Sequence, residues 1–215
     1  MRARWLAVVL VIAIIPVGAQ AGERVLFDPA SMLGTAERMD FVGRNIFAAE
    51  PSEKGIVLRS TPHRSASGLY EGVDLPAQSL TNISWGWRVD QLQAHADIRE
   101  LATEDFGAAV FFIFGEPTLF NRDVPTIAYV WSATPVANAT VLRSKRFASL
   151  RFVQLRGRGD VGGWHIEGRN VAADFRAIFG KEPPMLRKIA VFNDNDQTGE
   201  PTSALFGSVV CETPC

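Results

Sequence analysis

The chain has 215 residues, with 22 lysines and arginines against 23 aspartates and glutamates. The formal net charge of −1 gives no support for binding to nucleic acid, which requires a basic surface. Hydrophobic residues make up 47% of the chain, enough for one domain with a sizeable core.

Residues 1–21 have the parts of a secretory signal peptide. Arg2 and Arg4 form a basic start, and Pro16 follows the apolar run just before small residues that end at Ala21. The run of about 17 residues is short for a permanent anchor, which needs roughly 20. We therefore expect cleavage after Ala21, a single domain over 22–215, no membrane span after cleavage, and a periplasmic or secreted location.

Short apolar stretches separated by turn residues predict ten or eleven strands. The clearest is 81–89, where Trp85, Trp87 and Val89 alternate with polar or small residues. The stretches 106–114 and 186–192 are apolar on both faces, so each needs cover on both sides. The other predicted strands are 24–27, 55–60, 66–73, 127–132, 139–143, 148–156, 164–167 and 203–210.

One helix is expected, over 171–179. Asn170 is a suitable N-cap, apolar residues recur at helical spacing from Val171 to Phe179, and Gly180 suits a left-handed C-terminal position. We expect this helix to cover the outer face of a sheet. Because no long helices separate the strands, the sequence predicts an all-β, mainly antiparallel fold: a jelly-roll-like β-sandwich with one short α-helix packed on a sheet.

Aromatic side chains are the main candidate ligand contacts. Rings can stack on sugar faces, although in a sandwich most aromatic residues belong to the core. The candidate binding residues are Trp85, Trp87, Tyr129, Trp131, Trp164 and Arg169.

Acidic residues near the predicted helix are the candidate acids and bases. Glu167, Arg169 and His165 alternate to one face of a strand, where they could line a cleft or form a buried structural ion pair. Asp105, which follows Glu104, is the second candidate carboxyl group. If catalysis occurs, we expect Glu167 or Asp105 as acid or base and Arg169 as the orienting group.

The segment from Asp194 to Gly199 spells D-x-D-x-T-G. Oxygen atoms of Asp194, Asp196 and Thr198 could bind a calcium ion, or the segment could form a turn in which Asp side chains accept from nearby amides. We expect no other cofactor. Gly157–Gly162 spells G-x-G-x-x-G, but the next residues are strand-like, so we interpret it as a glycine-rich hairpin turn. Cys211 and Cys215, the only cysteines, could form a local disulfide bond.

These segments together resemble a bacterial family known as domain of unknown function 3047. The resemblance implies an exported bacterial protein with no assigned activity. Two positions depart from the pattern: Ala109 stands where we expect Arg, and Ser208 where we expect Asp. The matching residues are Trp85-Gly-Trp87, Glu104-Asp105-Phe106, Tyr129-Val-Trp131-Ser132, Trp164, Glu167, Arg169-Asn170-Val171, Asp174-Phe175, Phe179-Gly180, Asp194, Asp196 and Thr198-Gly199.

Three functions remain open at this point. The first is a non-catalytic binding protein for a glycan or another cell-envelope component, which the export signal and the tryptophan-rich strands favour. The second is a glycan hydrolase or lyase that uses Glu167 or Asp105. The third is a structural or interaction scaffold, which predicts no concave polar site.

Overall fold

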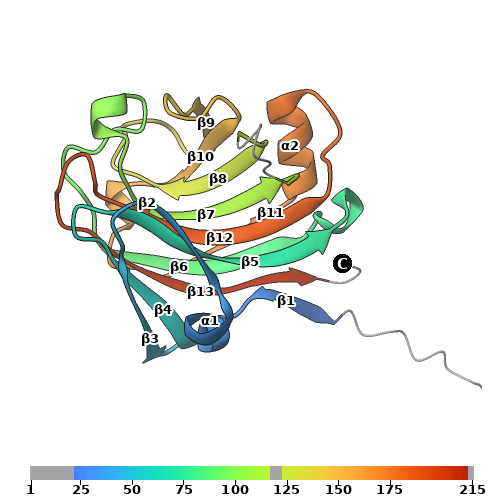
Figure 1. Cartoon of the computed structure of the whole chain (residues 1–215), viewed down its shortest axis with the longest axis horizontal. Coiled ribbons are helices and arrows are strands. Elements are labelled where there is room, and N and C mark those ends of the chain that lie inside the picture. The colour runs from blue at the N-terminus through green and yellow to red at the C-terminus, as the bar shows by residue number, and fades with distance from the viewer. Residues whose placement is uncertain (1–21, 117–122, 213–215) are drawn as a thin grey trace, which may run out of the picture.

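The computed structural model describes residues 22–116 and 123–212, whose strands form two sheets that pack face to face (Figure 1). The first sheet has the order β11-β6-β13-β4-β3, with β1 paired to β13. The second has the order β2-β5-β12-β7-β8-β10-β9. Every pair is antiparallel except β8 with β10, which confirms the predicted jelly-roll-like sandwich. The predicted signal peptide lies outside the described residues.

The bounds of the elements are as follows. The first sheet contains β1 (Glu23–Phe27), β3 (Ile46–Ser52), β4 (Gly55–Thr61), β6 (Ile83–Gln91), β11 (His165–Arg169) and β13 (Ser203–Glu212). The second contains β2 (Glu37–Val42), β5 (Ala66–Leu75), β7 (Phe106–Phe114), β8 (Thr126–Trp131), β9 (Thr140–Arg143), β10 (Leu150–Arg156) and β12 (Leu186–Asp194). The helices are α1 (Pro29–Thr35) and α2 (Val171–Phe179), with single 3₁₀ turns at Ala77–Ser79, Leu101–Thr103 and Arg158–Asp160.

The main core lies between the sheets and is built on large aromatic side chains. Trp85 and Trp87 of β6 meet Tyr129 and Trp131 of β8, with ring centroids 5.1 Å apart for Trp85–Tyr129 and 5.8 Å apart for Trp87–Trp131. All four side chains are at most 2% exposed. The tryptophans of β6 lie on one face of the strand, as the alternation predicted, and that face points into the core.

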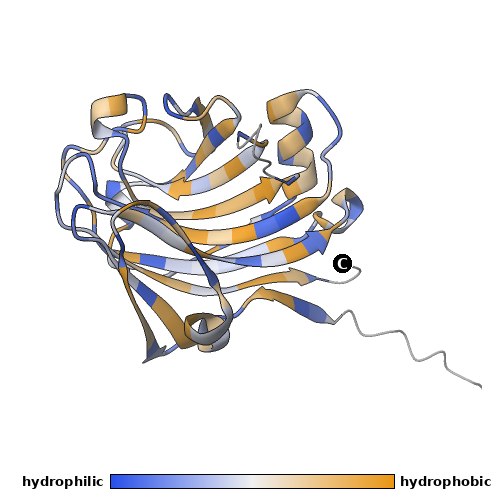
Figure 2. Ribbon diagram, viewed as in Figure 1, coloured by the Kyte–Doolittle hydropathy of each residue, from blue (hydrophilic) through white to orange (hydrophobic). Residues whose placement is uncertain are grey.

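The second sheet is apolar on its outer face as well. Every residue of β7 is buried, and most residues of β12 are too. Hydrophobic colour dominates β7, whereas β12 combines hydrophobic and hydrophilic segments (Figure 2). Ile189 and Val191 of β12 face the main core, whereas Ala190 and Phe192 belong to a second apolar cluster on the outer face. The prediction that both faces of these strands need cover is confirmed.

Helix α2 has the predicted residues and caps. The Asn170 side chain accepts from the amide of Ala173 at 2.8 Å, and Gly180 adopts φ of +67°, in the left-handed region. Its position differs from the prediction: Val171, Ala172 and Phe175 belong to the core between the sheets, and Phe175 packs on Phe114 at 4.6 Å. The helix closes an end of the sandwich instead of covering an outer face (Figure 1).

Three elements are additional to those predicted. Helix α1 begins with Asp28, whose side chain accepts from Ala30, and with Pro29 in its first turn. Its seven residues are too few for a clear apolar stripe. Strands β2 and β3 are mostly exposed or half-buried, and Pro51 in β3 is tolerated because that strand is at an edge.

The G-x-G-x-x-G segment joins β10 to β11, which belong to different sheets, so it is a crossover turn and not a hairpin. Only a single 3₁₀ turn opens on it, which excludes the strand-to-helix geometry of a dinucleotide site. Among the described residues, no helix has the length and apolar character needed to cross a bilayer.

Candidate functional site

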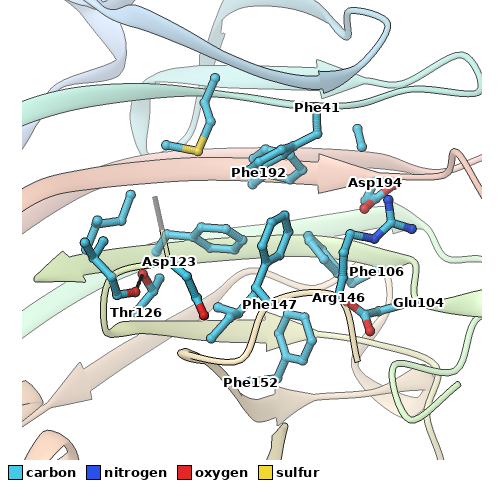
Figure 3. Close-up of a pocket in the computed structure, with 16 residues that line it drawn as sticks. Phe41, Glu104, Phe106, Asp123, Thr126, Arg146, Phe147, Phe152, Phe192 and Asp194 are labelled. Atoms are coloured by element: carbon cyan, nitrogen blue, oxygen red, sulfur yellow. Dashed lines mark hydrogen bonds between the residues drawn. The ribbon is translucent and has the colours of Figure 1, made fainter. Parts of the chain in front are cut away.

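A pocket of about 380 Å³ opens on the outer face of the second sheet (Figure 3). Its floor comes from β5, β12, β7, β8 and β10, and its sides come from β2 and from the loops before β7, β8 and β10. Most of its surface is hydrocarbon. The lining residues are Met39, Phe41, Ala66, Glu104, Phe106, Phe111, Ile113, Asp123, Val124, Thr126, Arg146, Phe147, Leu150, Phe152, Phe192 and Asp194.

Phenylalanine rings define the shape of the pocket. Phe111 and Phe192, on neighbouring strands, stack with centroids 5.3 Å apart and planes 9° apart. Phe106 fills the space between Phe111, Phe192 and Phe152. At the mouth, Phe41 contacts Phe192 at 5.5 Å and Phe147 at 5.4 Å, although Phe41 is 49% exposed. An exposed ring that continues a buried apolar surface is typical of a binding site.

The charged residues of the pocket gather toward its ends (Figure 3). Glu104, Arg146 and Asp194 lie toward one end, and Asp123 lies toward the other with Thr126. Glu104 accepts from the Ser144 hydroxyl at 2.8 Å and from the amide of Lys145 at 2.9 Å. These two bonds attach the turn that carries Arg146 and Phe147 to the loop before β7.

Asp194 also belongs to a cluster of three carboxyl groups with Asp105 and Asp196, in which one oxygen from each lies within 4.8 Å of the others. Burial, contact with the Asp196 carboxyl and the charge of Asp105 together hold the pKa of Asp194 well above its usual range. Within 22–116 and 123–212, no Lys or Arg forms an ion pair with any of the three. These surroundings favour the protonated form of Asp194.

The D-x-D-x-T-G segment forms a tight turn held by Asp105. The Asp105 carboxylate accepts from the amides of Gln197 and Thr198 and from the Thr198 hydroxyl, at 3.2, 2.7 and 2.6 Å. The Asp194 side chain accepts from the amide of Asp196 at 3.1 Å. This is the hydrogen-bonded turn that was the alternative to a calcium site.

The candidate calcium ligands are only partly brought together. Asp194 and Asp196 converge, but the Thr198 hydroxyl is engaged with Asp105, which takes its place in the cluster. Asp196 Oδ1 is buried and has no hydrogen-bond partner in the part of the chain that the structure describes. Calcium binding by this cluster stays a prediction.

The candidate sugar-stacking residues do not face the pocket. Trp85, Trp87, Tyr129 and Trp131 are buried between the sheets, so their faces are covered by each other and by the core. Trp164 is half-buried beside Gly86 of the first sheet, away from the pocket. The core interpretation of the first four is correct, and their role as a sugar platform is excluded by burial.

The candidate catalytic residues are also placed elsewhere. Glu167 is paired with Arg156 at 2.7 Å and accepts from the indole N–H of Trp87 at 2.9 Å. Arg169 does not join Glu167; it forms a bidentate pair with Asp174 of α2, at 2.7 and 2.9 Å. Neither Glu167 nor Asp105 lines the pocket. Of the predicted trio, Glu167 and Arg169 belong to two separate ion pairs, and His165 belongs to neither. The same Asp174 accepts a hydrogen bond from the Tyr129 hydroxyl. The pKa of Tyr129 is raised well above 10, mainly by burial and also by the negative charge of Asp174.

The family model described as "Protein of unknown function (DUF3047)" matches residues 37–210. The chain belongs to the DUF3047 family. Of the two positions where this DUF3047 protein departs from the expected pattern, Ala109 lies in the outer apolar cluster, opposite Phe192. Ser208 lies in β13 of the other sheet, so the two positions do not form one site. Among proteins with curated descriptions, none matches the chain.

Several solved structures are similar to this DUF3047 protein. A metagenome-derived glycoside hydrolase family 12 endoglucanase has 11% identity and a TM-score of 0.48, over 88% of this chain and 94% of that one. The family 11 carbohydrate-binding module of a Clostridium thermocellum cellulase has 11% identity and a TM-score of 0.45, over 89% and 95%. The xyloglucanase domain of NopAA from Sinorhizobium fredii has 10% identity and a TM-score of 0.46, over 90% and 99%. At these values the likeness carries no argument about ligand or activity.

Proposed function

We propose that this DUF3047 protein is a non-catalytic binding protein that holds the apolar part of a small ligand in the phenylalanine-lined pocket. The observation that carries the proposal is the continuity of the pocket surface from buried Phe111 and Phe192 to exposed Phe41. A pocket of this size with hydrocarbon walls and a few polar groups at its ends is typical of small-molecule sites.

The walls favour a hydrocarbon ligand over a glycan. Sugars need closely spaced hydrogen-bond donors and acceptors beside a ring platform, whereas the centre of this pocket presents phenyl and aliphatic groups. Of the two ligand classes expected from the sequence, a glycan or another envelope component, the pocket supports an envelope component with an apolar body. Export to the periplasm is part of this proposal.

Titration with the neutral fluorescent probe N-phenyl-1-naphthylamine tests the proposal. We expect saturable binding to the wild type and about tenfold weaker binding to Phe41→Ser, because the exposed ring contributes apolar contact area at the mouth. Ile166→Ser is the matched control, since Ile166 is 69% exposed on β11 of the other sheet. Absence of saturable binding, or equal loss in both variants, would contradict the proposal and favour a scaffold without a ligand.

The second candidate function is hydrolysis of a glycan. Its support is that Glu104 and Asp194 line one pocket while the pKa of Asp194 is raised, and paired carboxyl groups with different pKa values are typical of glycosidases. Reducing-end assays on soluble polysaccharides distinguish the two functions. The binding proposal predicts no release of reducing ends, and release that is abolished in Glu104→Gln would establish hydrolysis instead.

A further inference from the structure

Arg146 is the charged group of the pocket that is least engaged with the rest of the protein. It lies in the turn between β9 and β10, where its own amide and that of Phe147 donate to the Ser144 hydroxyl at 3.1 and 3.2 Å. Because Ser144 in turn donates to Glu104, the turn is fixed at the mouth of the pocket. The exposed guanidinium has no hydrogen bond or ion pair with any residue in 22–116 or 123–212.

The carboxyl groups of the pocket differ from Arg146 in this respect. Glu104 accepts from Ser144 and Lys145, and Asp123 accepts from the amide of Ser149 at 3.0 Å. Asp194 accepts from Asp196 and is further engaged with the acidic cluster. All three therefore already have donors, whereas the five N–H groups of the guanidinium have no acceptor. Among the described residues that line the pocket, Arg146 is thus the charged group that lacks a polar partner.

Resting on the proposed function, we propose that the ligand is a long-chain carboxylic acid, whose hydrocarbon chain lies on Phe111 and Phe192 and whose carboxylate pairs with Arg146. A guanidinium can bind a carboxylate through two parallel hydrogen bonds, and such a pair is stronger beside an apolar wall than in water. A ligand with a cationic head would instead leave Arg146 unpaired and add to its charge.

Displacement of N-phenyl-1-naphthylamine by twelve-carbon ligands tests the head group separately from the chain. We expect dodecanoate to bind the wild type about fivefold more tightly than dodecanol, the effect of one partly exposed ion pair. Arg146→Gln should abolish that preference and leave the affinity for dodecanol unchanged, and Arg146→Lys should retain part of it. Arg143→Gln, which removes an exposed arginine from neighbouring β9, should leave the preference intact.

The outcomes separate this inference from the proposed function. Equal binding of dodecanoate and dodecanol, or tighter binding of dodecyltrimethylammonium, would overturn the role of Arg146 while the apolar pocket stands. If neither the probe nor any of the three ligands binds, the proposed function itself fails.

Discussion

At the scale of single residues, burial decides what each polar group can do. The two candidate acids and the candidate calcium ligand Asp194 have different surroundings. Glu167 has a cation, Asp105 has backbone donors, and Asp194 has neighbouring carboxyl groups. The pKa of Asp194 is raised, because burial and the neighbouring carboxyl groups both disfavour its ionised form. Residue type and spacing alone do not distinguish these surroundings.

Asp194 should make stability depend on pH. Its pKa in the folded state is raised, so the folded protein keeps a proton that the unfolded chain loses above about pH 4. The free energy of unfolding should therefore fall as pH rises from about 4 to the raised pKa of Asp194 in the folded protein. The expected fall is on the order of 1 kcal/mol or more. Asp194→Asn, which stays neutral, should remove this decrease. Urea unfolding of both proteins with EDTA, at about pH 5 and about pH 8, measures the effect. The same decrease in both proteins would show that another group is responsible.

Glu167→Gln should lower stability without affecting ligand binding. The variant leaves Arg156 without its closest carboxylate, and an amide oxygen can still accept from Trp87, so we expect a loss of about 1–3 kcal/mol. Glu182→Gln, in an exposed pair with Arg176, should change stability by less than about 0.5 kcal/mol. Thermal and urea unfolding together with probe titration give both readouts. Weaker probe binding at unchanged stability would place Glu167 in the site after all.

At the scale of elements, the pocket depends on the close pairing of β5 with β12. Gly68 lies opposite Phe192 in that pair. A Cβ atom at Gly68 would come within 2.4 Å of the Val191 carbonyl oxygen and 2.6 Å of a Phe192 ring carbon. The absence of a side chain at Gly68 therefore lets the Phe192 ring lie flat on the outer face and stack on Phe111.

Gly68→Ala should lower the free energy of unfolding by about 1–3 kcal/mol, as expected for overpacking, and weaken probe binding because the Phe192 ring must move. Gly34→Ala is the matched control, because a Cβ atom there meets nothing within 4 Å. Gly34 lies in helix α1, so alanine should be neutral or stabilising by up to about 1 kcal/mol. A variant Gly68→Ala with normal stability and normal probe binding would show that the strands can separate without disturbing the pocket.

At the scale of the whole molecule, the sequence predicted the layers better than the site. Strands such as β6 and β7 follow from local alternation or continuous apolar character, and α2 follows from Asn170 and Gly180, because these signals lie within a few residues. The pocket instead depends on residues far apart in the chain. Phe41, Phe111 and Phe192 are brought together by the strand order β2-β5-β12-β7. Strand order and register cannot be deduced from local patterns.

The same limit explains why the tryptophans were candidate ligand contacts. Alternation along β6 places Trp85 and Trp87 on one face but does not say whether that face meets the other sheet or solvent. The apolar character of β7 and β12 on both faces was more informative about the site, because both faces of that sheet must then be covered. The first sheet covers the inner face of the second sheet. The outer face of the second sheet is only partly covered, and the pocket opens where it is uncovered.

Chemical-shift mapping of the protein during titration with dodecanoate would locate the bound ligand directly. We expect saturable shifts at Phe41, Phe111, Ile113 and Phe192, with Ile56 and Ile166 on the other sheet unchanged. Shifts centred on Ile56 or Ile166, or no shifts at all with any apolar ligand, would contradict the proposed function.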